Sequence, residues 1–144
     1  MHTTAHTTQR PTAAFVGASW GALLIGASAY LIGLWNAQMQ LNEKGYYLTL
    51  LLYGLFAAVS LQKTVRDRSE GLQVTGLYVG MCWISLLSAV LLLTVGLWNA
   101  TLAPSEKGFY AMSFTLSLFA VVAVQKNVRD LAGLKGAEPQ SDVA

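Results

Sequence analysis

The sequence predicts an all-α integral membrane protein with four transmembrane helices, arranged as two tandem parallel-repeat helical hairpins. Of its 144 residues, 54% are hydrophobic and 11% are charged, whereas a soluble domain carries about 25% charged residues. The charges leave uncharged runs at 11–42, 45–62, 71–105 and 108–125. Since a helix needs roughly 20 apolar residues to cross a bilayer, this pattern excludes a soluble domain, a nucleic-acid binder and a disordered chain.

An internal repeat with an offset of 63 residues is the second observation behind this prediction. Aligning 17–67 with 80–130 without a gap gives 22 identities in 51 positions. Three motifs carry most of the matches: Gly33-Leu34-Trp35-Asn36-Ala37 with Gly96-Leu97-Trp98-Asn99-Ala100, Glu43-Lys44-Gly45 with Glu106-Lys107-Gly108, and Gln62-Lys63-Thr64-Val65-Arg66-Asp67 with Gln125-Lys126-Asn127-Val128-Arg129-Asp130. The chain is therefore a tandem duplication.

The elements can be placed in order, because each boundary is seen twice. We expect a polar cytoplasmic tail (1–12), a first two-helix repeat (13–67, helices about 13–37 and 44–62), a cytoplasmic linker (68–74), a second repeat (75–130, helices about 75–100 and 108–125) and a second cytoplasmic tail (131–144). The connections within the repeats are short, which predicts antiparallel hairpins. Asn42 and Ser105 are the expected N-caps of the second helix in each repeat.

Basic residues indicate the orientation of these helices. Seven of the nine Lys and Arg residues fall on the side of the termini and of the linker, and only Lys44 and Lys107 fall on the other side. The positive-inside rule therefore puts both termini in the cytoplasm. Two helices per repeat return the chain to its starting side, so the repeats run in parallel about a pseudo-twofold axis along the membrane normal. The spacing of Trp20 from Trp35, and of Trp83 from Trp98, matches two interfacial aromatic belts.

The repeated motifs resemble the YiaA/YiaB two-helix-domain family of bacterial inner-membrane proteins. The resemblance covers about residues 14–131, and the tandem arrangement is similar to the YiaA-like form of the family. It implies a multi-pass protein of a Gram-negative inner (plasma) membrane. It implies no activity, substrate or cofactor.

The motif that contains Lys63, Arg66 and Asp67, with Lys126, Arg129 and Asp130 in the second copy, has two interpretations. Basic residues at a cytoplasmic helix end attract anionic lipids or a cytoplasmic partner. The same residues also suit the negative end of the helix dipole and anchor the helix at the interface. We favour the anchor. The pairs Lys63–Asp67 and Lys126–Asp130 have the i,i+4 spacing of helical ion pairs.

The motif Glu43-Lys44-Gly45, repeated as Glu106-Lys107-Gly108, holds the charges on the opposite side. It indicates either a capped hairpin turn, in which the glycine leaves room for the adjoining helix, or a pore mouth or ligand site lined by both copies. We favour the turn, although a cap does not require the lysines.

Polar residues near the ends of the first and third helices include Asn36 and Asn99, beside Trp35 and Trp98. We expect them to close a helix C-terminus or to bond across the bundle. No charged residue lies within an expected span, which argues against a proton relay or an ion-coupled pump.

Small residues at four-residue spacing predict close helix contacts. They are Ala13, Gly17 and Gly21 on the first helix, and Gly76 and Gly80 on the third. We expect these faces to join the two copies, or this chain to a second copy or another membrane protein within the lipid bilayer.

Candidate groups for catalysis or for a cofactor are few. Cys82 lies in the third helix and has no partner in the chain, and His2 and His6 lie in the N-terminal tail without a third ligand. Phosphate-loop, zinc-protease and hydrolase motifs are absent from the sequence. We therefore expect no enzyme, no cofactor, no metal site and no nucleic-acid partner. The prediction is a small structural or interaction protein with an assembly or membrane-stress accessory role; the alternative is a transporter or channel-like oligomer for a small solute.

Overall fold

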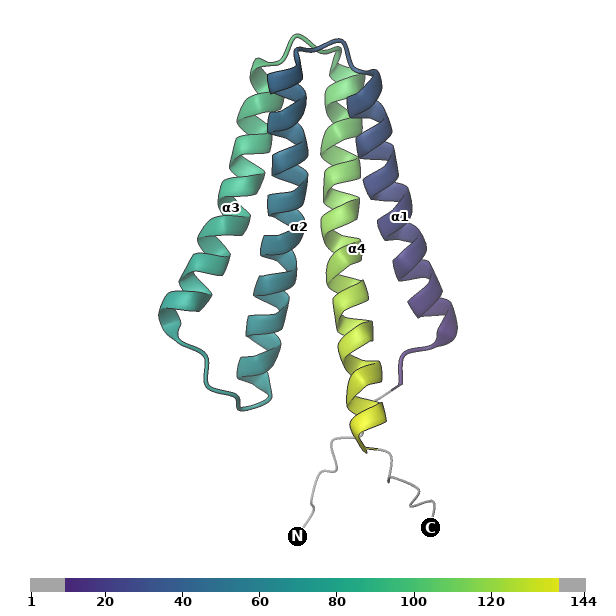
Figure 1. Cartoon of the computed structure of the whole chain (residues 1–144), viewed down its shortest axis with the longest axis vertical. Coiled ribbons are helices and arrows are strands. Elements are labelled where there is room, and N and C mark those ends of the chain that lie inside the picture. The colour runs from purple at the N-terminus through teal and green to yellow at the C-terminus, as the bar shows by residue number, and fades with distance from the viewer. Residues whose placement is uncertain (1–9, 138–144) are drawn as a thin grey trace.

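The computed structural model describes residues 10–137, and these residues form four α-helices. The helices are α1 (Ala13–Asn36), α2 (Leu41–Ser69), α3 (Gly76–Asn99) and α4 (Pro104–Ala137). Each is long and apolar enough to cross a membrane. The start of α1 and the end of α4 lie at one end of the bundle, and the connections 37–40 and 100–103 lie at the other (Figure 1). We call these the termini end and the connection end. The expected all-α fold with four apolar helices is confirmed.

The starts of α1 and α3 use equivalent caps. Thr12 accepts a hydrogen bond from the Phe15 amide at 3.1 Å, and Thr75, 63 residues later, accepts one from the Tyr78 amide at 3.3 Å. The threonine oxygen thus satisfies a backbone donor that has no partner inside the helix.

The starts of α2 and α4 differ from the expectation. Asn42 and Ser105 are not N-caps, because α2 begins at Leu41 and α4 begins at Pro104. Proline fits the first helical position, where the missing amide would have no partner in any case. Glu43 and Glu106 still lie in the first turn, at the positive end of the helix dipole.

The second helix of each repeat is longer than its apolar segment. Helix α2 continues to Ser69 and α4 continues to Ala137, past the expected ends at 62 and 125. Residues 131–137, which we expected in the C-terminal tail, are therefore helical, and both copies of the basic motif lie on helices. His2 and His6 lie outside the described residues.

The two hairpins are interleaved, which the sequence did not predict. Helix α1 packs mainly against α4 and α3 packs mainly against α2, whereas α1 and α2 touch only slightly. Helices α2 and α4 form the central pair, and the two connections cross at the connection end (Figure 1). Each repeat therefore obtains most of its packing from the other repeat.

Glycines permit this close packing, although not the glycines we expected. A Cβ atom added at Gly26, Gly33, Gly54 or Gly96 would lie 2.7–2.8 Å from a side chain of the other repeat: Ser117, Phe109, Phe114 and Tyr46 respectively. Such distances are shorter than van der Waals contact, so a larger residue would separate the helices.

The open glycines correct two expectations. Among the described residues, a Cβ at Gly17, Gly21, Gly76 or Gly80 would meet nothing within 4 Å, so the expected contact between the copies at these positions is wrong. A Cβ at Gly45 or Gly108 would likewise meet nothing within 4 Å in the described part of the chain. These two glycines do not make room for an adjoining helix.

Candidate functional site

The repeated motifs gather at the two ends of the bundle, where the twofold relation places equivalent residues of the two copies near each other. The basic motif lies at the termini end, on α2 and α4. The motifs of the first and third helix ends and of the Glu-Lys-Gly turns lie at the connection end.

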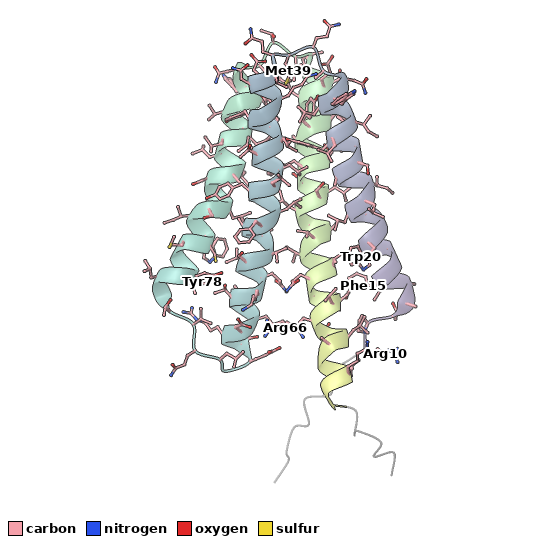
Figure 2. All side chains as sticks on the ribbon, viewed as in Figure 1. Arg10, Phe15, Trp20, Met39, Arg66 and Tyr78 are labelled. Atoms are coloured by element: carbon pink, nitrogen blue, oxygen red, sulfur yellow. The ribbon has the colours of Figure 1, made fainter. Side chains whose placement is uncertain are left out.

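Two reciprocal ion pairs join α2 and α4 at the termini end. The Arg66 guanidinium pairs with Asp130, and the Arg129 guanidinium pairs with Asp67 at 2.6 Å. Arg66 lies between the two central helices in Figure 2. Because Arg-Asp at 66–67 recurs at 129–130, a twofold axis between α2 and α4 brings each arginine to the aspartate of the other copy. We call these the crossed ion pairs.

Further ion pairs surround the crossed ones. Lys63 bonds Asp67 at 2.8 Å and Lys126 bonds Asp130 at 3.0 Å, each one helical turn apart. Glu70, which has Gly133 as its counterpart, pairs with Arg66 at 3.1 Å and with Arg129 at 2.8 Å. Each carboxylate of this network therefore has two cationic partners.

The network changes the acidity of its members. Hydrogen bonds from Lys63 and Arg129 lower the pKa of Asp67, and those from Arg129 and Arg66 lower the pKa of Glu70. Burial of Asp130 favours its neutral form, but hydrogen bonds from Arg66 and Lys126 outweigh burial, so its pKa is also lowered. These carboxylates are stabilised in their charged form.

A layer of small polar residues follows toward the middle of the bundle. Asn127 donates to the Ser19 hydroxyl at 3.2 Å, which joins α4 to α1. The equivalent positions in the other copy, Thr64 and Cys82, lie 3.8 Å apart through oxygen and sulfur. The sequence analysis missed this layer, although the 63-residue offset relates the two pairs.

Aromatic rings fill the core toward the connection end. Tyr30 is fully buried and donates to the Tyr47 carbonyl at 2.8 Å. Its ring meets Tyr110 edge-on at 5.6 Å and lies 6.2 Å from Phe114. Edge and offset arrangements of this kind are favourable for aromatic pairs.

Two open clefts lie above this aromatic core at the connection end, each between an outer and a central helix. The Glu106 cleft has a volume of about 740 Å³ and the Glu43 cleft about 450 Å³. The clefts meet where the connections cross, near Met39 in Figure 2.

Each cleft combines the first-helix end of one repeat with the second-helix start of the other. Gly33, Asn36, Glu106, Phe109 and Tyr110 line the Glu106 cleft, and their counterparts Gly96, Asn99, Glu43, Tyr46 and Tyr47 line the Glu43 cleft. The interleaved packing thus creates both clefts. A hairpin packed on itself would not bring these motifs together.

The lysines of the turns point elsewhere. Lys44 donates to the Trp35 carbonyl at 3.1 Å and lies in a groove between α1 and α2, outside both clefts. The carbonyls at a helix C-terminus carry partial negative charge, which a lysine neutralises. A cap at the start of α2 does not require a lysine. The bond to the Trp35 carbonyl explains Lys44, because it caps the end of α1 instead.

The asparagines and tryptophans have simple placements. Asn36 donates to the Ile32 carbonyl and Asn99 to the Val95 carbonyl, each at 2.9 Å, so they bond their own helices and not a partner across the bundle. Trp35 and Trp98 are 81% and 82% exposed on the outer surface. This exposure is typical of interfacial anchors. Within residues 10–137, no group of three or more His, Cys, Asp or Glu could hold a metal ion.

Comparisons with known proteins agree with this architecture. Residues 15–67 and 78–130 each match the family described as the yiaA/B two helix domain. The chain is 60% identical over 117 residues to the inner membrane protein YiaA of Escherichia coli (strain K12), which covers 81% of each protein.

Two further relatives are more distant. The inner membrane protein YiaB of E. coli is 31% identical over 96 residues, covering 67% of this chain and 81% of YiaB. The uncharacterized membrane protein YubF of Bacillus subtilis (strain 168) is 36% identical over 63 residues, covering 43% of this chain and 72% of YubF. No solved structure matches the chain.

Proposed function

Because this chain belongs to the family of the yiaA/B two helix domain, we propose that it is a structural or interaction protein of the inner membrane, with an assembly or membrane-stress accessory role and without catalysis. Its four apolar helices and its inner-membrane relative support a multi-pass protein in that membrane.

The filled contact between the central helices is the observation that carries this proposal. Phe114 of α4 is 2% exposed, and its ring approaches Gly54 of α2 closely. Leu51, the counterpart of Phe114, is also 2% exposed. The crossed ion pairs then join the same two helices at the termini end. Large side chains thus occupy the pseudo-symmetric interface that a solute pathway would follow.

Flux through liposomes tests this function directly. The purified chain in liposomes should pass potassium or ethanolamine no faster than empty liposomes do. A protein-dependent flux that rises with the protein-to-lipid ratio would contradict the proposal and favour the alternative, a transporter or channel-like oligomer for a small solute.

The proposal includes both termini in the cytoplasm, which the excess of basic residues at the termini end supports. A Cys82→Ser chain provides a thiol-free background, and the equivalent position of the first repeat is already a serine, Ser19. A cysteine at exposed Asn42 or Ser105 should react with an impermeant thiol reagent outside spheroplasts, whereas one at Ser69 should react only after lysis. The opposite labelling pattern would mean that the chain has the opposite orientation in the membrane.

We also propose that the open faces at Gly17, Gly21, Gly76 and Gly80 contact a second copy or another membrane protein. The absence of any neighbour within 4 Å of these positions, among the described residues, supports this assignment. Cross-linking in native membranes from a cysteine at Gly17 should give a discrete adduct. Labelling by lipid-soluble reagents alone would mean that this face contacts lipid.

A further inference from the structure

We propose that the Glu43 cleft and the Glu106 cleft each bind one primary ammonium group, carried by a lipid headgroup or by a free amine. This inference goes beyond the proposed function, since a structural protein does not need such a site. It depends on four features of the clefts: their unpaired charge, their hydrogen-bond acceptors, their aromatic residues and their place in the membrane.

The carboxylates of Glu43 and Glu106 are the charged groups that line the clefts. Among residues 10–137, neither takes part in an ion pair. The adjacent lysines line neither cleft, and Lys44 is held by the Trp35 carbonyl. Each cleft therefore carries a net negative charge that a cation can neutralise.

Acceptor groups are available beside each carboxylate. The Asn36 and Asn99 amide nitrogens already donate within their own helices, which leaves their side-chain oxygens to accept. Both residues end helices whose C-terminal carbonyls carry partial negative charge. A primary ammonium group supplies three donors and no acceptor, as this set requires.

Aromatic residues line each cleft together with residues of the two connections. Phe109 and Tyr110 line the Glu106 cleft, and Tyr46 and Tyr47 line the Glu43 cleft. The Tyr46 hydroxyl is occupied by the Leu92 carbonyl at 2.6 Å. Tyr47 and Tyr110 are buried and stack on each other, with ring centroids 6.2 Å apart, so Phe109 and Tyr46 are the rings that a ligand can reach. Ring faces attract ammonium groups within about 6 Å, so these two rings and the carboxylates favour the same ligand.

The clefts lie where amine headgroups occur. The exposed Trp35 and Trp98 lie at the ends of α1 and α3, the two outer helices whose ends line the clefts. Tryptophan prefers the headgroup level of a membrane. Their volumes of about 740 and 450 Å³ are in the range of small-molecule sites.

The two copies retain the same key residues in these clefts. Glycine, asparagine and glutamate are identical at 33/96, 36/99 and 43/106. The glycines are explained by the rings packed on them, and the asparagines by their helix bonds. The glutamate side chains suit the positive end of the helix dipole at the starts of α2 and α4. They form no ion pair among the described residues, and ammonium binding gives their charge a second role.

Binding to the full-length chain in detergent tests this inference with two probes. Ethanolamine is titrated by calorimetry, and phosphatidylethanolamine is measured by native mass spectrometry, with phosphatidylglycerol as the anionic comparison. The variants are Glu43→Gln, Glu106→Gln and the double variant. Glu70→Gln, with the same change of charge at the termini end, is the matched control.

The wild-type chain and Glu70→Gln should bind two equivalents of at least one ammonium probe, and each single cleft variant should bind one. The double variant should bind roughly tenfold or more weakly, because a charge-assisted hydrogen bond is lost at each site. Binding of phosphatidylethanolamine but not of ethanolamine identifies the lipid headgroup as the source of the ammonium group. Displacement of the lipid by ethanolamine shows that a free amine occupies the same clefts.

Three results would overturn the inference: no binding of either ammonium probe by the wild type, equal binding of phosphatidylglycerol, or undiminished binding by a folded double variant. Thermal unfolding and gel filtration establish that the variants fold. If the double variant does not fold, the halved stoichiometry of each single variant decides the question. The liposome flux experiment is independent of this test, so failure of one leaves the other standing.

Discussion

The two ends of this bundle use the same twofold symmetry for opposite purposes. At the termini end, each carboxylate of Asp67 and Asp130 lies between two cations, one from its own helix and one from the other repeat. At the connection end, Glu43 and Glu106 form no ion pair among residues 10–137, and each lines an open cleft. The twofold symmetry thus pairs the charged side chains with each other at the termini end, whereas it gives two separate open clefts at the connection end.

The position of the charged motif relative to the axis explains this difference. The Arg-Asp motifs lie on α2 and α4, the two helices that face each other across the axis, so reciprocal pairing is available. Glutamates on the same two helices face the outer helices α3 and α1, whose ends are apolar apart from the asparagines. Four experiments test this difference, in order of decreasing expected effect.

The largest expected effect is at the connection end, from Gly33→Leu. A Cβ at Gly33 would lie 2.7 Å from the Phe109 ring, so leucine must push α1 from α4 at the expense of about 1–3 kcal/mol of unfolding free energy. Gly133→Leu is the matched control, because a Cβ at Gly133 would meet nothing within 4 Å among the described residues. It should not lower stability, since leucine favours a helix more than glycine does. Thermal unfolding in detergent measures both. Equal losses would mean that the loss at Gly33 does not come from its contact with Phe109.

At the termini end, Asp130→Asn should destabilise the chain by about 1–2 kcal/mol. Arg66 and Lys126 would both lose their ion pair with Asp130, whose side chain is only 7% exposed. Exchange of the pair in the double variant Arg66→Asp, Asp130→Arg should recover part of the loss. Lys135→Gln, on exposed surface in the last turn of α4, is the control. If the exchange recovers nothing, the crossed ion pair is not a source of stability.

Acid should weaken the termini end by a smaller amount. The pKa values of Asp67, Glu70 and Asp130 are lowered in the folded chain, so their contribution is full above the ordinary carboxylate range near pH 4 and falls as the pH drops below it. The melting temperature should therefore be flat from pH 7 to 5 and decline toward pH 3. In the Asp67→Asn, Asp130→Asn double variant the decline should be shallower. An equally steep decline would place the acid-sensitive groups elsewhere.

The smallest effect is expected from Tyr30→Phe in the aromatic core. It removes the hydrogen bond from the Tyr30 hydroxyl to the Tyr47 carbonyl and keeps the ring. Hydrogen bonds between helices in membrane proteins average about 0.6 kcal/mol, so the unfolding free energy should fall by about that amount. A loss of several kcal/mol would show that this bond, and not ring packing, holds α1 to the bundle.

The apolar helices, their number in residues 10–137 and their duplication could all be predicted from the sequence. Apolar run length decides whether a helix crosses a bilayer, because unpaired backbone groups are costly in lipid. The 63-residue offset decides the symmetry, and the i,i+4 spacing predicts the Lys63–Asp67 and Lys126–Asp130 pairs, which are present in the structure. These features are local, or they repeat along the chain.

The choice of which helices pack together depends on the three-dimensional packing. Short connections predict hairpins, but they do not prevent α1 from packing on α4 instead of α2. That choice depends on shape, since Gly26, Gly33 and Gly96 receive side chains of the other repeat, whereas equally small residues such as Gly17 and Gly80 receive none among the described residues. The crossed ion pairs and the twin clefts both follow from this packing. They could not be predicted without it, because a small residue permits close approach without specifying its partner.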